Sequence, residues 1–253
     1  MIYVVGIGPG GYDGLTGEAL EALKTCEVIS GYKRYVELVK DFFPEKFFMS
    51  YPMRSEVARC EEALKVAEMG YSVALISSGD AGVYGMAGIM LEVAKGSADI
   101  KIIPGVTAAN SAAAVLGAPL MNDYVTISLS DLMTDWEIIE KRLRTACKGD
   151  FVICLYNPAS HHRPDSFKRA CDIMLRYKPP ETVCGYVRNI NRPGQESKLM
   201  TLDEIRDCEE IDMLTTVIIG NSQTYALDGK MITRRGYEKA VRSEEVGGRN
   251  EEL

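Results

Sequence analysis

Short apolar runs and longer amphipathic stretches alternate along the first half of the chain. The apolar runs predict strands at residues 3–7, 28–29, 47–48, 72–76 and 100–103. Apolar side chains at helical spacing predict helices at residues 16–26, 32–39, 55–69 and 89–93, and an alanine-rich helix after residue 107. In the helix at 55–69, Val57, Leu64 and Ala67 mark the expected apolar face. A repeated order of strand and helix is typical of a largely parallel sheet.

Glycine, proline and asparagine interrupt this alternation at residues 117–122. Beyond the break, the pattern predicts strands at 124–129, 151–156, 182–187, 197–201 and 215–219, and helices at 136–147, 165–177 and 202–206. Two successive strands after Arg188, without a helix between them, indicate a mixed sheet. We therefore expect an α/β protein of two α/β domains, residues 1–118 and 119–237, with a charged tail at 238–253 that frays.

Composition and charge narrow the class of protein. Of the 253 residues, 46% are hydrophobic and 26% are charged, as in ordinary soluble globular proteins. The apolar runs are too short to span a bilayer, and the first residues read as a strand and not as a signal peptide, so we expect a cytoplasmic protein. A formal net charge of −7 argues against general nucleic-acid binding, although local arginines can still bind a small anion.

Cysteine and histidine give little support for a metal site. The seven cysteines are irregularly spaced without a Cys-x-x-Cys pair, so we expect them to be reduced and mostly buried. His161 and His162 are the only histidines, and adjacent residues suit a loop better than a shared metal ion. We predict no metal bound by the protein.

Glycine-rich or polar segments follow several predicted strands. The stretch SSGDAGVYGMAG at residues 77–88 has four glycines between a strand and a helix, and Asp80 is its only charged residue. Further segments of this kind are found at residues 104–109, 155–163, 186–189 and 220–222. Each alone is compatible with a simple turn. Because ligands of open α/β sheets bind at the carboxyl ends of strands, together they predict a binding cleft between the two α/β domains.

The pattern Gly6-x-Gly8-x-x-Gly11 follows the first strand and has the spacing of a dinucleotide fingerprint. Pro9 lies inside this turn and has no N–H for a pyrophosphate, and the second strand ends without the acidic residue that would bind a ribose. No Gly-Lys-Ser/Thr of a nucleotide-binding P-loop follows. A dinucleotide-dependent oxidoreductase is therefore an alternative that the residues disfavour.

Three motifs together resemble the tetrapyrrole methylase family: GIGPG at residues 6–10, Gly79-Asp80, and PGVTA at 104–108. The resemblance covers about residues 1–237. Within the family, GDAGVYGMAG at 79–88, LYNP at 155–158 and TRRGY at 233–237 look like the ring-contracting members, which methylate ring carbon 17 of precorrin-3B or cobalt-factor III in cobalamin synthesis. Arg234 stands where these members often have proline.

The resemblance implies a class III methyltransferase fold, with S-adenosyl-L-methionine in the cleft between the domains and S-adenosyl-L-homocysteine as product. Carried over by position, it implies these cofactor-binding residues: Pro9, Gly79, Asp80, Val83, Thr107, Ala108, Asn157, Val187 and Arg188. The implied substrate is an anionic tetrapyrrole with many carboxylates, which arginines bind well. The candidate substrate-binding residues are Arg34, Arg54, Tyr84, Arg163 and Arg192, with Arg188 and Tyr32 as further possibilities.

Ring contraction needs more than methyl transfer, and a general acid or base can assist it. The candidates are Asp80, Tyr84 and Ser130, together with Ser128 and Asp131, and the sequence does not choose between them. Methylation at another ring position and a non-catalytic tetrapyrrole carrier remain open alternatives. The resemblance also implies a homodimer, and it leaves open whether the substrate contains cobalt.

Overall fold

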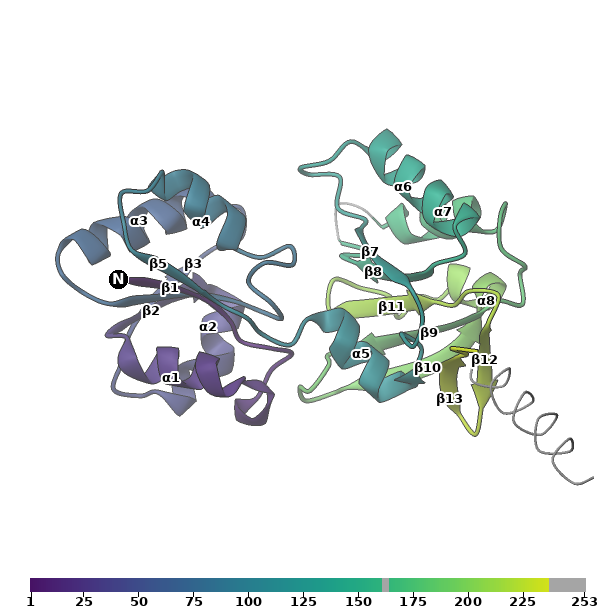
Figure 1. Cartoon of the computed structure of the whole chain (residues 1–253), viewed down its shortest axis with the longest axis horizontal. Coiled ribbons are helices and arrows are strands. Elements are labelled where there is room, and N and C mark those ends of the chain that lie inside the picture. Colours follow the sequence, from purple (N-terminus) through teal and green to yellow (C-terminus); the bar gives the residue numbers. More distant parts are fainter. Residues whose placement is uncertain (161–163, 237–253) are drawn as a thin grey trace, which may run out of the picture. The chain divides into compact units, whose positions relative to one another are not determined.

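The computed structural model of the chain describes residues 1–160 and 164–236, which form two compact units (Figure 1). Unit 1 consists of Met1–Ser111 and Asn189–Gln195, and unit 2 consists of Ala112–Arg188 and the described residues from Glu196 onward. The domain bounds expected at 1–118 and 119–237 differ from these units at residues 112–118 and Asn189–Gln195, and they remain a prediction. The expected tail at 238–253 lies outside the described residues.

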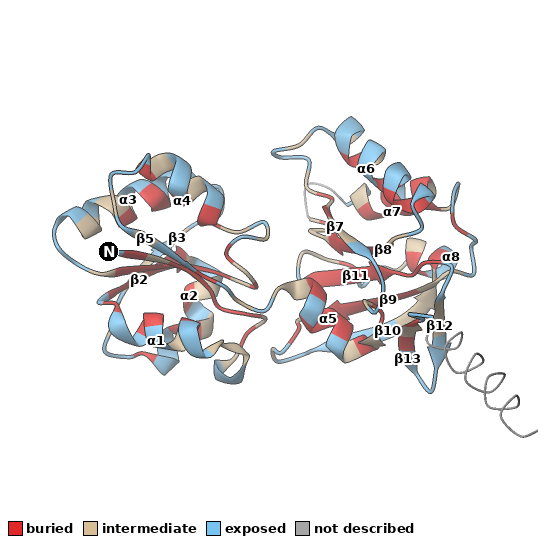
Figure 2. Cartoon of the chain, in the orientation of Figure 1, coloured by how far each residue is buried: buried red, intermediate tan, exposed pale blue. Residues whose placement is uncertain are grey.

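Unit 1 is built on a five-stranded sheet with the strand order β3-β2-β4-β1-β5. Its strands are β1 (Ile2–Gly6), β2 (Val28–Tyr32), β3 (Phe47–Tyr51), β4 (Val73–Ser77) and β5 (Ile100–Ile103). All four strand pairs are parallel, which confirms the prediction from the alternating pattern. The central strand β4 is buried throughout, as expected for a parallel sheet covered on both faces. Figure 2 colours much of the sheet of unit 1 as buried.

Helices cover both faces of this sheet. The elements are α1 (Gly17–Thr25), α2 (Lys33–Val39), α3 (Glu56–Glu68) and α4 (Ala87–Ala94), with short 3₁₀ turns η1 (Tyr12–Gly14) and η2 (Lys40–Phe42). Val5 packs in one cluster with Leu23 of α1, whereas its neighbour Val4 packs in another with Met90 of α4. Because successive strand residues face opposite sides, α1 and α2 lie on one face and α3 and α4 on the other.

The buried face of α3 differs from the face that the sequence predicts. Arg59, Cys60 and Ala63 are buried, and Val57 is 52% exposed. The expected apolar face was therefore wrong at Val57. The helix turns a charged arginine toward the sheet in place of this valine.

Unit 2 contains a second five-stranded sheet with the order β10-β9-β11-β8-β7. Its strands are β7 (Tyr124–Ser128), β8 (Val152–Tyr156), β9 (Val183–Arg188), β10 (Glu196–Thr201) and β11 (Thr215–Ile219). The β7 and β8 pair is parallel and the other three pairs are antiparallel, which confirms the predicted mixed sheet.

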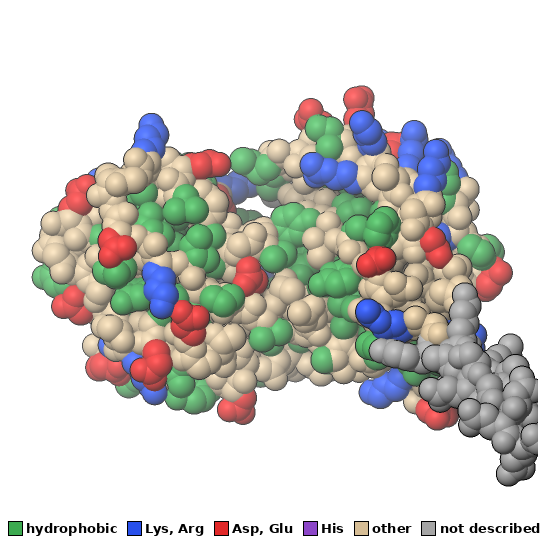
Figure 3. Space-filling view, viewed as in Figure 1, with side chains coloured by type: hydrophobic (Ala, Val, Ile, Leu, Met, Phe, Trp, Pro, Cys, Tyr) green, Lys and Arg blue, Asp and Glu red, His purple; other side chains and the backbone are tan. Residues whose placement is uncertain are grey.

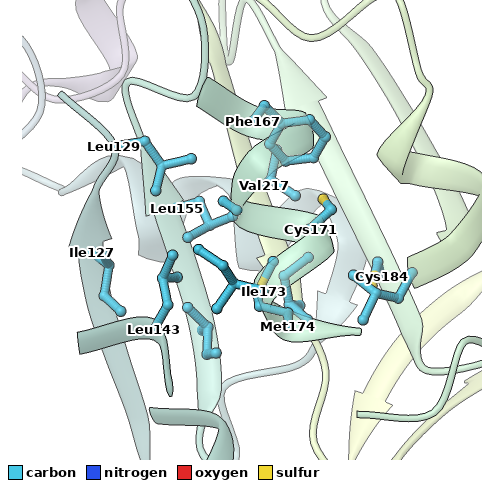
Figure 4. Packing of buried hydrophobic residues seen from close by; sticks show 14 of the residues in the cluster. Ile127, Leu129, Leu143, Leu155, Phe167, Cys171, Ile173, Met174, Cys184 and Val217 are labelled. Atoms are coloured by element: carbon cyan, nitrogen blue, oxygen red, sulfur yellow. The ribbon is translucent and has the colours of Figure 1, made fainter. Parts of the chain in front are cut away.

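Three helices cover one face of this sheet: α6 (Trp136–Lys148), α7 (Ser166–Met174) and α8 (Leu202–Arg206). Figure 4 shows Leu143 of α6 and Ile173 of α7 close to Leu155 of the sheet. The other face meets α5 (Ala108–Leu116), where an ideal Cβ on Gly185 of β9 would lie 2.9 Å from the Leu116 side chain. A glycine in the middle of β9 thus lets α5 approach the sheet closely.

A small three-stranded sheet completes unit 2 and was not predicted. It consists of β6 (Gly117–Ala118), β12 (Thr224–Leu227) and β13 (Lys230–Thr233) in the order β12-β13-β6. Asp228 and Gly229 form the hairpin turn, both with positive φ, at 49° and 71°. The predicted loop at 117–122 therefore begins with a short strand.

The surface shows no single charged face in the view of Figure 3. Acidic and basic side chains are interspersed over unit 1, and lysines and arginines gather over α6 in unit 2. Within the described part of the chain, no helix has both the length and the apolar character needed to cross a bilayer. The seven cysteines carry free thiols, and six of them are buried, as predicted.

Candidate functional site

The order of strands in unit 1 identifies where a ligand would bind. β1 and β4 are neighbours, but the chain leaves β1 toward α1 on one face and leaves β4 toward α4 on the other. In open α/β sheets, ligands bind at the carboxyl ends of strands where the connections diverge in this way. The glycine-rich turn at residues 6–11 and the stretch 77–88 both begin at this position.

Backbone hydrogen bonds join these two loops directly. The Gly8 amide donates to the Gly79 carbonyl oxygen at 2.9 Å, and the Gly79 amide donates to the Gly8 oxygen at 2.7 Å. Gly79 has a φ of +69°, a conformation that glycine adopts without strain. An ideal Cβ on Gly105, after β5, would lie 2.2 Å from the Gly79 oxygen. The three loops therefore meet backbone to backbone, and larger residues would separate them.

Asp80 links two of the loops through its carboxylate. Oδ1 accepts from the Gly82 amide at 2.8 Å, and Oδ2 accepts from the Gly105 amide at 3.0 Å. Asp80 as a whole is half-buried. The Asp80 side chain is thus a fixed acceptor that holds the PGVTA segment in place.

Arg192 ties the same loops together from a distant part of the sequence. It belongs to Asn189–Gln195, which connects β9 to β10 but is part of unit 1. Its Nε donates to the Pro9 oxygen at 2.8 Å, and its Nη2 donates to Ser78 Oγ at 2.9 Å. Next to it, Asn191 Nδ2 donates to the Gly10 oxygen at 2.5 Å. Burial lowers the pKa of Arg192, which nevertheless keeps its charge at neutral pH.

The structure brings the six predicted cofactor residues of unit 1 to one edge of its sheet. Pro9 follows β1, Gly79, Asp80 and Val83 follow β4, and Thr107 lies just before α5, whose first residue is Ala108. Pro9, Val83, Thr107 and Ala108 are all half-buried. On the outer side of the loop, an ideal Cβ on Gly82 would meet only Asp80 Oδ1, at 3.2 Å, apart from its chain neighbours. The edge therefore offers backbone groups with open space beside them.

The substrate-binding candidates of unit 1 differ in exposure. Arg34, in the first turn of α2, and Arg54, with a φ of +65°, are exposed. Tyr84 is 54% exposed and also has a positive φ, of 54°. Tyr32 is half-buried and packs edge-on against Tyr35, with ring centroids 5.2 Å apart. Arg163 lies outside the described residues.

Unit 2 presents its own candidates at the carboxyl ends of β7 and β8. Asn157 has a φ of +51° and its Nδ2 donates to Ser128 Oγ at 2.9 Å. The same hydroxyl accepts from the Ser130 amide at 3.2 Å. Asp131 follows in the exposed loop and has an interaction partner of its own. These contacts gather Ser128, Ser130 and Asn157, three of the predicted residues.

Arg188 and Val187 lie at the end of β9 and are more constrained. Arg188 Nε donates to Asp212 Oδ2 at 2.9 Å, and Nη1 lies 3.7 Å from Glu196 Oε2. The Val187 side chain is fully buried. Two carboxylates therefore already neutralise the predicted anion-binding charge of Arg188. Cofactor binding by Val187 and Arg188 remains a prediction.

Sequence reasoning missed three residues around the site in unit 1. Ser78 accepts a hydrogen bond from Arg192, and Asn191 donates one to the Gly10 oxygen. Arg59 is buried beside Met86. A signal for Asn191 and Arg192 exists in the run Asn-Ile-Asn-Arg-Pro-Gly, typical of an ordered turn, but nothing in it names the partner loops. Within residues 1–160 and 164–236, no group of three or more His, Cys, Asp and Glu side chains is arranged to bind a metal ion.

Comparison with known proteins gives consistent similarities. Residues 1–206 match the family described as Tetrapyrrole (Corrin/Porphyrin) Methylases. The chain is 48% identical over 240 residues to the "Probable cobalt-factor III C(17)-methyltransferase" of Salmonella typhimurium, covering 94% of this chain and 99% of that protein. It is 38% identical to the "Precorrin-3B C(17)-methyltransferase" of a Sinorhizobium species, covering 88% and 89%. The crystal structure of the methyltransferase CobJ superposes with a TM-score of 0.84 at 36% identity, covering 92% and 99%.

Proposed function

The chain belongs to the tetrapyrrole methylases, and from this premise we propose that it is an S-adenosylmethionine-dependent methyltransferase that acts on ring carbon 17 of precorrin-3B or cobalt-factor III in cobalamin synthesis. The observation that carries the proposal is 48% identity to a cobalt-factor III C17-methyltransferase over nearly the whole of both chains. The motif GDAGVYGMAG, from which the sequence predicts the same activity, forms the loop after β4 at the candidate site.

We propose that the loops after β1, β4 and β5 bind the cofactor. The predicted residues at this edge are Pro9, Gly79, Asp80, Val83, Thr107 and Ala108, with Asn157, Val187 and Arg188 as the candidates in unit 2. Support comes from the open backbone of the β4 loop and from the contact of Gly105 with Gly79, which no larger residue would permit. S-adenosylmethionine supplies an activated methyl group, so the protein needs chiefly to position the two reactants. Asp80 and Arg192 serve that purpose by holding the loops together.

The substrate in this proposal is a polycarboxylate ring, and the arginine guanidinium binds carboxylates through bidentate hydrogen bonds. Arg34 and Arg54 are exposed near the same edge of unit 1 and have no carboxylate within 4.0 Å among the described residues. Tyr84 is exposed enough to lie against a ring face. Arg192 uses two of its donors on Pro9 and Ser78, so its contribution to substrate binding would fall on the remaining N–H groups.

Ring contraction would require proton transfer, and the candidates now fall into two groups. Both Asp80 oxygens already accept backbone N–H groups, which suits a positioning role. Ser130 lies beside Ser128 and Asn157 at the end of the unit 2 sheet, and Tyr84 lies exposed in unit 1. Separate Tyr84→Phe and Ser130→Ala variants would identify the contributor as the one that still methylates but accumulates an uncontracted, methylated ring.

The direct test is incubation of the purified protein with S-adenosylmethionine and the precorrin-3 or cobalt-containing ring, followed by mass spectrometry and NMR. We expect one added methyl group at carbon 17. A methyl group at another carbon would assign the chain to a different position within the family. Absence of methyl transfer with both rings, under aerobic and anaerobic conditions, would refute the proposal. Comparison of the two rings decides whether the substrate contains cobalt.

We also propose a cytoplasmic homodimer, as the sequence and the family resemblance lead us to expect. Light scattering coupled to size exclusion would give twice the 27.9 kDa chain mass for a dimer. Cell fractionation would test the location.

A further inference from the structure

Arg59 is a buried arginine without a carboxylate partner. It lies in α3, is 3% exposed, and faces the sheet of unit 1. Nη1 donates to Met86 Sδ at 3.5 Å and Nη2 donates to the Pro52 oxygen at 3.4 Å, both long contacts to neutral acceptors. Nε is fully buried and has no hydrogen-bond partner. Within the described residues, no carboxylate oxygen lies within 4.0 Å of this guanidinium.

Two half-buried arginines of unit 2 are paired with carboxylates, whereas Arg192, like Arg59, donates only to neutral acceptors. Arg206 donates to Asp172 at 2.6 Å and to Asp207 at 2.8 Å, and Arg188 is paired with Asp212. An unpaired buried charge destabilises a fold unless a further group, such as a bound anion, compensates it. Burial lowers the pKa of Arg59, but an arginine remains a cation at physiological pH.

The face of the sheet that Arg59 packs against contains another buried polar atom without a partner. Ser30 Oγ of β2 has no hydrogen bond. Ser30 faces the same side as Val28, whose side chain packs with Ala63, one helical turn after Arg59. Ser30 and Arg59 therefore lie on the same side of the sheet.

Further cations act on the same tyrosine as Arg59. Burial raises the pKa of Tyr35, and the charges of Arg192, Arg59 and Arg34 oppose that rise. Arg34 and Arg192 belong, like Arg59, to unit 1. Pro52, whose oxygen contacts Nη2, is itself exposed, so the segment that covers Arg59 lies at the surface.

From this geometry we propose that Arg59 is the inner anchor of a carboxylate-binding subsite for the polyanionic ring substrate, with the Nε–Nη2 edge receiving the carboxylate in place of the Pro52 carbonyl. The inference rests on the proposed function. The Nε and Nη2 donors are parallel, which matches the two oxygens of a carboxylate. Arg34 and Arg54 would meet the outer carboxylates at the surface.

The test uses uroporphyrin, an octacarboxylate ring, as the probe and its octamethyl ester as the uncharged reference, with binding followed by fluorescence. Arg59→Met is compared with the wild-type chain and with Arg176→Met, which removes an exposed arginine of unit 2. We expect Arg59→Met to weaken uroporphyrin binding by between about tenfold and a hundredfold. Calorimetric affinity for S-adenosylhomocysteine should stay within twofold of wild type. The melting temperature should be equal or higher, because an unpaired buried charge is removed.

Two results would overturn the proposal. One is uroporphyrin affinity within twofold of wild type in folded Arg59→Met. The other is a lower melting temperature with equal losses for both ligands, which indicates a purely structural arginine. If Arg59→Met does not fold, Arg59→Lys decides: it keeps the charge but loses the two-pronged geometry, so wild-type uroporphyrin affinity in it refutes the subsite. If the wild-type chain binds neither uroporphyrin nor S-adenosylhomocysteine, the proposed function is overturned, and the inference about Arg59 is overturned with it.

Discussion

Replacing Arg192 by methionine tests whether this residue holds the cofactor loops in place. The substitution keeps an unbranched apolar side chain but removes the donors to the Pro9 oxygen and to Ser78 Oγ. Hydrogen bonds from charged groups contribute about 1.5–3 kcal/mol each, and the low end applies because Arg192 is only half-buried. Two bonds then amount to about 3 kcal/mol, or roughly a hundredfold in a dissociation constant if all of it serves to order the loops for binding.

We expect the Kd for S-adenosylhomocysteine, measured by titration calorimetry, to rise between about tenfold and a hundredfold in Arg192→Met. The Kd of Arg192→Lys should lie between those of Arg192→Met and the wild type, because one ammonium group cannot reproduce the planar set of guanidinium donors. Arg142→Met removes an exposed arginine of α6 and serves as the control. An unchanged Kd in folded Arg192→Met would refute the reasoning, and weaker uroporphyrin binding alone would return Arg192 to the role of a substrate ligand.

Three further changes test the site and the core. Asp80→Asn leaves one acceptor oxygen for two backbone amides, so the free energy of unfolding measured in urea should fall by about 1–3 kcal/mol. The control Asp13→Asn changes an exposed residue and should leave this free energy unchanged. Equal stabilities of the two variants would contradict the link that the Asp80 carboxylate forms between Gly82 and Gly105. Gly105→Ala would place its Cβ 2.2 Å from a backbone oxygen and should lower both the melting temperature and S-adenosylhomocysteine affinity. Gly88→Ala, with open space around it in α4, should be neutral or stabilising, and similar behaviour of the two glycine variants would count against close contact of the loops. Burial raises the pKa of the Cys154 thiol from its ordinary value of 9.0 to about 12, so its contribution to stability is complete below pH 9 and is lost as the pH rises toward 12. Between pH 8 and pH 10, the unfolding free energy of the wild-type chain should therefore fall more steeply than that of Cys154→Ala. The difference in slope should be up to about 1.4 kcal/mol per pH unit above pH 9, and parallel pH profiles of the two proteins would exclude the effect.

Features that depend on neighbouring residues were predictable from the sequence. The strands and helices of both units follow the apolar period, and the loops after β1, β4 and β5 are marked by glycine at the ends of buried runs. The hairpin of β12 and β13 was missed although Asp228-Gly229 is a strong local signal for it. The turn residues therefore specify this hairpin locally.

Contacts between distant residues were not predictable in this way. Arg192 reaches Pro9 across 183 positions and Ser78 across 114, and no local pattern specifies such partners. The burial of Arg59 likewise depends on how far α3 is rotated about its axis, and the sequence offers Val57 as an equally good inward residue. Side-chain contacts of the site therefore required the structure, whereas the loops that carry them did not.

The placement of Asn189–Gln195 in unit 1 has a consequence for the order of events during synthesis. The first 111 residues of unit 1 leave the ribosome before this segment has been translated. The remaining residues of unit 1 follow after about 80 more positions, a delay of about 4–16 s at bacterial and eukaryotic elongation rates of roughly 5–20 residues per second. During that interval the nascent unit 1 has its parallel sheet but lacks the hydrogen bonds from Asn191 and Arg192. The loops after β1 and β4 would then reach their final order only once β9 has been made.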